Sequence, residues 1–186
     1  ALYCAFLDIR KAYPSCDRLR IWRQLLRLGI PISLVRAVAS LYYDATIEIK
    51  TVASSGSCRG MSATPPIPMR RGLREGCVLS PLLWAVYVWD IAEFIANRFP
   101  THLISDLVCM TDLPAGSSSA ALVGRFFLLL FADDILTCSH SEVGLQPLLD
   151  CLQAYASHCG FSFSSDPSKV GGSCVVVFRP PVVDGG

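Results

Sequence analysis

The sequence predicts an α+β fold in which a layer of helices packs against a largely antiparallel sheet. Apolar runs of strand character lie at residues 2–9, 126–139 and 174–178. Longer segments between them carry apolar residues at helical spacing. The run at 126–139 is interrupted by two adjacent acids, which is typical of two strands joined by a tight turn. Such a hairpin favours antiparallel pairing.

The first part of the chain is expected to alternate between strand and helix. The expected segments are, in order, a strand at 2–9, a turn around 14–17, amphipathic helices at about 18–28 and 31–43, a strand at 46–52 and a turn-rich segment at 54–68. Glycine commonly ends a helix and proline commonly opens one. Gly29 and Pro31 therefore separate the two expected helices.

The second part of the chain is expected to begin with a long helix from Ser80 to about Asn97, with Pro81 in its first turn. The segments expected after it are a surface insertion at about 99–123, the hairpin, a helix at 141–158, a loop at 160–173 and a strand at 174–178. The insertion is expected because its Gly-Ser-Ser-Ser-Ala stretch is typical of surface loops. No internal repeat is visible.

The length of 186 residues indicates one domain, or a piece of a larger one. Hydrophobic residues make up 52% of the chain and charged residues 17%, with a mean hydropathy of +0.46, which excludes a disordered chain. Charges interrupt the apolar stretches before they reach membrane-spanning length, so no membrane partner is expected. The N-terminus carries no signal-peptide pattern. The excess apolar surface is expected to contact protein outside this sequence.

Nine cysteines are scattered singly through the chain, and no Cys-x-x-Cys pair occurs. An odd number cannot pair completely within one chain, which favours buried thiols in an intracellular, reducing compartment, either the nucleus or the cytoplasm. His158–Cys159 lacks partners at zinc spacing, so a zinc site is not expected. The net charge of +1 gives no overall signal for nucleic-acid binding.

Three acidic residues are candidates for a metal site. Asp133 and Asp134 fall at the expected hairpin turn, where like-charge repulsion and desolvation make two adjacent carboxylates costly unless a cation neutralises them. Asp8 lies near the end of the first expected strand, and the three would converge if that strand lay beside the hairpin. Carboxylate oxygens suit Mg²⁺ or Mn²⁺. A solvated turn is the alternative for the Asp pair, and a strand-end residue the alternative for Asp8.

Four blocks of the sequence resemble the palm of reverse transcriptases from non-LTR (LINE-like) retrotransposons. The blocks are FLDIRKAYPSCDR, RRGLREGCVLSPLLW, LLLFADDILTCSHS and LLDCLQAYASHCGFSFSSDPSKV, and a VVVF strand follows them. They occur in the order typical of that family, with plausible spacing, over residues 2–178. The resemblance implies a polymerase palm with a catalytic Asp-Asp hairpin in an antiparallel sheet.

The resemblance implies that Asp8 and Asp133 are the principal metal ligands, with Asp134 as the second acid of the pair and the Ile9 carbonyl as a further ligand. Two Mg²⁺ or Mn²⁺ ions would act as cofactors, activating the attacking hydroxyl and stabilising the leaving pyrophosphate. Because successive strand side chains point to opposite faces, the turn must redirect Asp134 for both acids of the pair to serve.

In the first block the resemblance implies three nucleotide-binding residues. Tyr13 matches the steric gate, a ring that excludes the 2′-hydroxyl and so selects deoxynucleotides. Lys11 and Ala12 would lie along the triphosphate, where backbone N–H groups and a cation oppose phosphate charge. A core aromatic is the alternative for Tyr13, and a solvated lysine the alternative for Lys11.

In the second and fourth blocks the resemblance implies contacts with nucleotide and template. Glu75 and Gly76 would lie against the nascent base pair, and glycine permits close backbone approach. Arg71 and Arg74 would contact template or phosphate. Lys169 matches a catalytic lysine that protonates pyrophosphate. An ordinary turn, surface arginines and a solvated lysine are the respective alternatives.

The function implied is RNA-directed DNA polymerase activity of a retrotransposon, with an RNA template, a DNA primer and dNTPs as partners. Residues 18–75 would be a partial fingers-side segment of the single domain 1–186. The N-terminal part of the fingers and the thumb, expected from the same polyprotein, would lie outside the sequence, so that this fragment alone could be inactive.

Three residues depart from the family pattern, namely Pro14, Glu75 and Val78. None of them removes a metal ligand, but Glu75 adds negative charge beside a polyphosphate site. A non-catalytic, decayed or truncated remnant is therefore an alternative, as is another palm-type polymerase. A metal-dependent phosphatase or nuclease is a more distant alternative, because it would need neither the second block nor a gate.

Overall fold

The computed structural model describes residues 1–55, 58–107, 128–164 and 172–179. Its strands are β1 (Leu2–Arg10), β2 (Thr46–Ile47), β3 (Lys50–Ser55), β4 (Cys58–Ala63), β5 (Ile67–Pro68), β6 (Leu128–Phe131), β7 (Asp134–Ser139), β8 (Ser162–Phe163) and β9 (Cys174–Phe178). Its helices are α1 (Ala12–Ser15), α2 (Arg18–Arg27), α3 (Ile32–Ser40), α4 (Ser80–Tyr87), α5 (Ile91–Ala96), the 3₁₀ helix η1 (Thr101–Asp106) and α7 (Glu142–Cys159).

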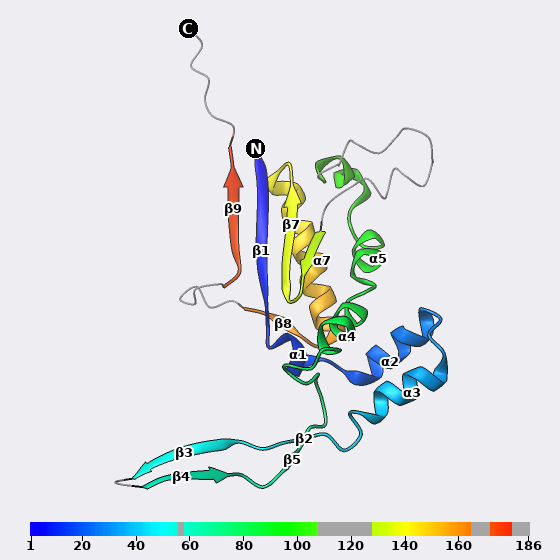
Figure 1. Cartoon of the computed structure of the whole chain (residues 1–186). Helices are drawn as coiled ribbons and strands as arrows, with labels where there is room; N and C mark the ends of the chain where they lie inside the picture. The colour runs from blue at the N-terminus through cyan, green and yellow to red at the C-terminus, as the bar shows by residue number, and fades with distance from the viewer. Residues whose placement is uncertain (56–57, 108–127, 165–171, 180–186) are drawn as a thin grey trace.

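The central sheet is antiparallel, as the sequence predicts. Its strands run in the order β6, β7, β1, and both β9 and β8 pair with the other edge of β1. β9 pairs along residues 2–6 of β1, and β8 pairs at Ile9 and Arg10. The first predicted strand therefore lies at the centre of the sheet, next to the hairpin formed by β6 and β7 (Figure 1).

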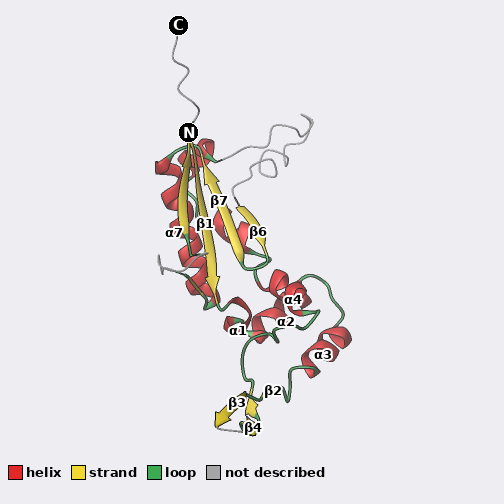
Figure 2. Ribbon diagram, turned by 60° about the vertical axis from the view of Figure 1, so that its left-hand side comes forward, coloured by secondary structure: helices red, strands yellow, loops and turns green. Residues whose placement is uncertain are grey.

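One face of the sheet is covered by helices and forms the core. Ala5, Ile9, Ile135 and Thr137 point to this face and are buried. α7 lies against it along the length of β1 and β7 (Figures 1 and 2), contributing the fully buried Leu148 and other side chains. This alternation follows from the two-residue period of a strand. The predicted layer of helices against an antiparallel sheet is confirmed.

The helix α7 agrees with its prediction because local signals define both ends. Its N-cap residue Ser141 accepts a hydrogen bond from the Gly144 amide at 2.9 Å. Gly160 ends the helix in the left-handed conformation, with φ of +81°. These are the usual devices for starting and ending a helix.

The segment 46–68 differs from the prediction of one strand followed by a turn-rich loop. β3 and β4 form a six-residue antiparallel hairpin from Lys50–Ala63 to Ser55–Cys58, and β2 pairs with β5 at its base. This hairpin extends away from the central sheet (Figure 1). The prediction was wrong here because backbone pairing between two such strands does not require the apolar alternation that identifies a half-buried strand.

The helix expected at 80–97 is broken between α4 and α5, at residues 88–90. Arg20 from α2 donates to the Tyr87 carbonyl at 3.2 Å and to the Asp90 carboxylate at 2.6 Å. Gln24 and Tyr155 each donate to the same carboxylate at 2.7 Å. The break is therefore held by side chains from elements far away in sequence.

The insertion expected at 99–123 begins as part of the packed structure rather than as a surface loop. Phe99 and Leu107 are buried, and Leu107 forms a β-bridge to Ser139. Residues 108–123 lie outside the described residues. Likewise, the loop expected at 160–173 contains β8, and its residues 165–171 lie outside the described part. Among described helices, none is both long and apolar enough to cross a membrane.

Candidate functional site

The ends of β1 and β7 bring two of the predicted acids together. Asp8 is paired directly with Asp134 in the antiparallel register, followed by Phe6 with Leu136. Directly opposite residues of an antiparallel pair point to the same face, with Cβ atoms roughly 4.5–5.5 Å apart. We call the face that carries these four residues the open face, because no described helix covers it (Figure 1).

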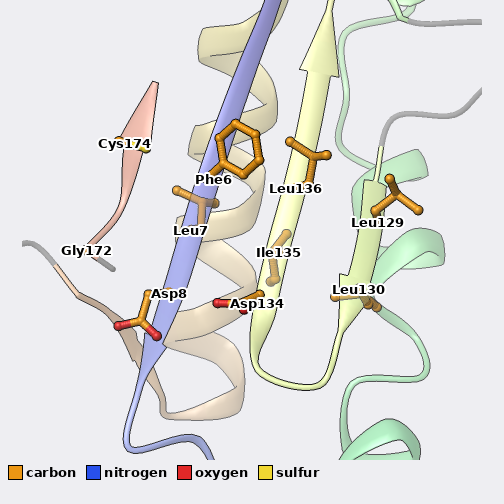
Figure 3. Close-up of a pocket in the computed structure, with 10 residues that line it drawn as sticks. All are labelled: Phe6, Leu7, Asp8, Leu129, Leu130, Asp134, Ile135, Leu136, Gly172 and Cys174. Atoms are coloured by element: carbon orange, nitrogen blue, oxygen red, sulfur yellow. The ribbon is translucent and has the colours of Figure 1, made fainter. Parts of the chain in front are cut away.

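A pocket of about 560 Å³ lies on the open face. Asp8 and Asp134 line one end of it, and apolar side chains such as Phe6, Leu129 and Leu136 line the rest (Figure 3). Phe6 and Leu129 are 41% and 44% exposed, which is high for large apolar side chains. The two carboxylates therefore lie at the border between an apolar surface and solvent.

The third predicted acid, Asp133, lies in the turn between β6 and β7. This turn has two residues, Ala132 and Asp133, because Phe131 pairs directly with Asp134. Asp133 is exposed and does not line the pocket. Within the described residues, no group of three or more potential ligand side chains is close enough to hold a metal ion. Two acids thus share one face, the third is adjacent, and the three-carboxylate set remains a prediction.

The carboxylates of Asp8, Asp133 and Asp134 have no hydrogen-bond donor or cationic partner among the described residues. Asp90 is different, since burial alone would raise the pKa of its carboxyl, but the Tyr155 hydroxyl and the Arg20 guanidinium outweigh it and hold this pKa below its usual value. Opposed acids on neighbouring strands repel each other. The carboxylate oxygens of Asp8, Asp133 and Asp134 are donors that a hard divalent cation prefers, and such a cation would neutralise their charge.

The backbone of Asp8 is held on the side away from β7. Its carbonyl accepts a hydrogen bond from the Ser164 amide at 2.8 Å, and its amide donates to the Ser173 hydroxyl at 3.2 Å. Ile9, whose carbonyl is a predicted metal ligand, has a buried side chain and pairs with Phe163. β8, the residue after it and the residue before β9 therefore set the position of Asp8.

The three residues predicted to bind nucleotide in the first block lie at the start of α1. Lys11 is exposed and has a positive φ of 51°, which turns the chain out of β1. Ala12 is buried, and its carbonyl accepts a hydrogen bond from the Ser15 hydroxyl at 2.8 Å. Tyr13 is half-buried, with its ring edge-on to that of Trp84 at a centroid distance of 6.3 Å.

The loop of the second block is attached to the turn of the first. The Gly72 amide donates to the Cys16 carbonyl at 3.0 Å, and the Leu73 amide donates to the Tyr13 carbonyl at 2.9 Å. Gly72 has φ of +85°, and a Cβ atom there would lie 2.8 Å from the Pro14 backbone. Glycine is therefore required for this close approach.

Glu75 and Gly76 follow in the same loop and are both exposed. Gly76 has φ of +76°, with nothing within 4 Å of the position that a Cβ atom would occupy. This space beside Gly76 is compatible with close approach of a ligand. The predicted role of both residues in nucleotide binding remains a prediction.

The predicted template arginines have partners within the chain. Arg71 donates to the carbonyls of Ser15 and Gly160, at 2.7 and 3.0 Å, and so joins the first block to the end of α7. The Arg74 guanidinium lies 5.8 Å from the ring centre of Tyr42. Their contact with a template remains a prediction. Lys169 lies outside the described residues.

Two residues that organise this region were not among the predicted site residues. Gly72 attaches the second block to the turn of the first. A glycine within Arg-Gly-Leu at an expected turn is the sequence feature that could have indicated this role. Trp84 is a buried residue of the core, with 2% of its surface exposed. Its indole nitrogen also donates to a backbone carbonyl of the β6–β7 turn, which no local pattern reveals.

Comparison with known proteins identifies the family. The model of the family described as reverse transcriptase (RNA-dependent DNA polymerase) matches residues 1–172. The chain belongs to the reverse transcriptase family. The predicted resemblance is thereby confirmed.

The curated relatives of this reverse transcriptase domain include polyproteins of R2 retrotransposable elements. The R2 proteins of Nasonia vitripennis and Popillia japonica are 26% and 25% identical to it, over 82% and 94% of this chain. The R2DM protein of Drosophila melanogaster is 26% identical over 88% of the chain. The domain covers only 12%, 22% and 13% of these relatives, respectively.

A solved structure has a similar fold. The apo telomerase of Candida tropicalis, truncated from its C-terminal domain, aligns with a TM-score of 0.51 and 10% sequence identity. The alignment covers 90% of this chain and 32% of the telomerase chain. At this identity the comparison supports the arrangement of sheet and helices and nothing finer.

Proposed function

We propose that this domain is the palm, with part of the fingers, of an RNA-directed DNA polymerase encoded by a retrotransposon. It would extend the 3′-hydroxyl of a DNA primer with dNTPs on an RNA template, as part of a longer protein. The observation that carries the proposal is the direct pairing of Asp8 with Asp134 on the open face. Membership of the reverse transcriptase family supports the same reaction.

Asp8, Asp133 and Asp134, with the Ile9 carbonyl, would hold two Mg²⁺ or Mn²⁺ ions. Such ions supply charge stabilisation for the attacking hydroxyl, the transferred phosphoryl group and the leaving pyrophosphate. Carboxylates without protein partners among the described residues are the donor type that these ions prefer. Because Asp134 is exposed, a substrate phosphate would have room to bind beside the two ions.

The first block would bind and select the nucleotide. Tyr13 would lie under the incoming sugar and exclude its 2′-hydroxyl. Lys11 and the Ala12 backbone would lie along the triphosphate. Their arrangement supports this role, because Lys11 is exposed where the chain leaves β1, two residues after Ile9.

The second and fourth blocks would complete the site. Glu75 and Gly76 would approach the nascent base pair from the loop that Gly72 and Leu73 attach to the first block. Arg71 and Arg74 would reach template phosphate only by giving up contacts within the domain. Lys169 would protonate the leaving pyrophosphate.

The protein would act in an intracellular, reducing compartment, either the nucleus or the cytoplasm. Burial raises the pKa of the Cys16 thiol to about 12, so this group is a poor nucleophile at neutral pH. Such buried thiols serve as packing groups, which fits a chain that needs no disulfides.

Primer extension by the full-length protein tests the proposal. Wild-type protein should incorporate dNTPs on an annealed RNA template in the presence of Mg²⁺ or Mn²⁺. Asp8→Asn and Asp134→Asn should abolish incorporation, whereas Asp44→Asn, which removes an exposed acid after α3, should not. A folded but inactive wild-type protein would instead favour a non-catalytic remnant.

A further inference from the structure

One buried indole connects the four sequence blocks. Trp84 belongs to the second block and lies in α4 with 2% of its surface exposed. Its ring is edge-on to Tyr13 of the first block and to Phe161 of the fourth, at centroid distances of 6.3 and 6.0 Å. Its Nε1–H donates to the Ala132 carbonyl of the third block at 2.6 Å.

The carbonyl that accepts this bond belongs to a strained residue. Ala132 has φ of +53°, a region that alanine rarely adopts. It is the first central residue of the two-residue β6–β7 turn, where glycine is preferred when φ is positive. The chain keeps an alanine here, and the next residue is Asp133. The conformation of the turn therefore decides where the Asp133 carboxylate points.

The burial of Trp84 and the conformation of the β6–β7 turn depend on the same hydrogen bond. A buried indole N–H that finds no acceptor costs free energy, so burial of Trp84 favours a turn whose carbonyl faces α4. The same bond holds the turn in a conformation that is strained at Ala132. The packing of α4 and the geometry of the turn are consequently coupled.

We propose that Trp84 is a positioning residue, which holds the Asp133 turn and the Tyr13 ring in one fixed spatial relation. The inference rests on the proposed function, since it concerns how the carboxylates are held relative to the sugar-selecting ring. The edge contact sets the Tyr13 ring and the Nε1–H bond sets the turn. Trp84 itself is buried, so it would act through these neighbours rather than on substrate or metal.

The variant Trp84→Phe separates this role from simple packing. Phenylalanine keeps an aromatic ring against Tyr13 and Phe161 and removes only the donor and part of the ring volume. Tyr87→Phe is the matched control. This variant removes one buried donor from the same helix. The Tyr87 hydroxyl donates to the Cys159 carbonyl on α7 and does not contact the turn.

Hydrogen exchange in the full-length protein is the first measurement, and it does not depend on activity. Peptides spanning residues 129–137 should exchange about tenfold faster in Trp84→Phe than in wild type, the factor that corresponds to loss of one net hydrogen bond. Tyr87→Phe should leave the exchange of these peptides unchanged. Equal exchange in Trp84→Phe and wild type would overturn the proposal.

Kinetics give the second measurement. Trp84→Phe should lower kcat for dNTP incorporation about tenfold and relax discrimination against ribonucleotides, with the KM for primer–template unchanged, because only positioning is affected. An unchanged kcat and selectivity alongside a loosened turn would overturn the proposal. If wild-type protein extends no primer, the proposed function fails, while hydrogen exchange still decides whether Trp84 holds the turn.

If Trp84→Phe does not fold, the wild-type indole protons decide. In ¹⁵N-tryptophan-labelled protein, the Nε1–H of Trp84 should exchange with solvent far more slowly than that of Trp89, which is 64% exposed. Fast exchange of the Trp84 proton in wild type would contradict the hydrogen bond and the inference with it.

Discussion

Asp8 and Asp134 lie directly opposite each other where β1 and β7 pair, on the face of the sheet that no described helix covers (Figure 1). The register of this pairing is decisive, because a shift by one residue would turn a strand's side chains to the opposite face. Ile135, the next residue, points to the covered face and is 1% exposed. Burial of Ile135 under the helices thus keeps Asp134 beside Asp8.

The proposed sugar selection depends on the bulk of Tyr13. Tyr13→Val should raise ribonucleotide incorporation relative to deoxynucleotide incorporation at least about tenfold, because the ring that blocks the 2′-hydroxyl is gone. Tyr13→Phe keeps the ring and should retain selectivity. The comparison is made by single-nucleotide primer extension with full-length protein. Unchanged selectivity in Tyr13→Val would remove Tyr13 from the gate role.

The attachment of the second block depends on Gly72. Gly72→Ala should lower the free energy of unfolding by roughly 2–5 kcal/mol, since the new methyl group meets the Pro14 backbone at 2.8 Å and φ is positive. Gly76→Ala is the matched control, because φ is equally positive but the space is open. It should cost about 1–2 kcal/mol. Denaturant unfolding measures both, and equal costs would contradict the close approach.

Arg71 stabilises the domain through two carbonyls. Arg71→Ala should lower the free energy of unfolding by about 1–3 kcal/mol, because the Ser15 and Gly160 carbonyls lose a charged donor. Arg70→Ala removes an exposed neighbouring guanidinium that makes no such bonds to the described residues, and it should change stability by less than about 0.5 kcal/mol. If the two variants were equally stable, the contribution of Arg71 would lie elsewhere, for example in template binding.

The ionisation of Asp90 should make the free energy of unfolding depend on pH in the acidic range. Its pKa is lower in the folded domain than in the unfolded chain, so its contribution is present above the unfolded value of about 4 and is lost as the pH falls through the folded value. Asp90→Asn should be less stable than wild type at pH 7, and the difference should narrow toward pH 3. Urea unfolding at several pH values measures it. A difference that does not change with pH would contradict the assignment.

The elements that the sequence predicted well carry their signals locally. Ser141 and Gly160 define α7 through a cap and a left-handed residue, and the interrupted apolar run predicts the hairpin. The break after α4 was missed because Asp90 is held by Arg20 and Tyr155 from distant elements. No pattern within residues 80–97 reports those contacts.

The sequence singles out the acids of the candidate site but does not determine how they are arranged. Asp8 and the Asp pair stand out as acids in apolar strands, but only the register decides that Asp134, rather than Asp133, lies opposite Asp8. The contact of Trp84 with the Ala132 carbonyl joins segments 48 positions apart in sequence. Such a contact follows from tertiary packing and does not correspond to any periodic pattern in the sequence.

Manganese binding is the most direct test of the claim that the paired carboxylates form a metal site. Full-length wild-type protein should reduce the EPR signal of free Mn²⁺ and bind more ions than Asp134→Asn, with binding by Asp44→Asn equal to that of wild type. Added dNTP should increase the difference, because its phosphates complete the ligand set. Equal Mn²⁺ binding by wild type and Asp134→Asn, with and without dNTP, would contradict a metal site at Asp8 and Asp134.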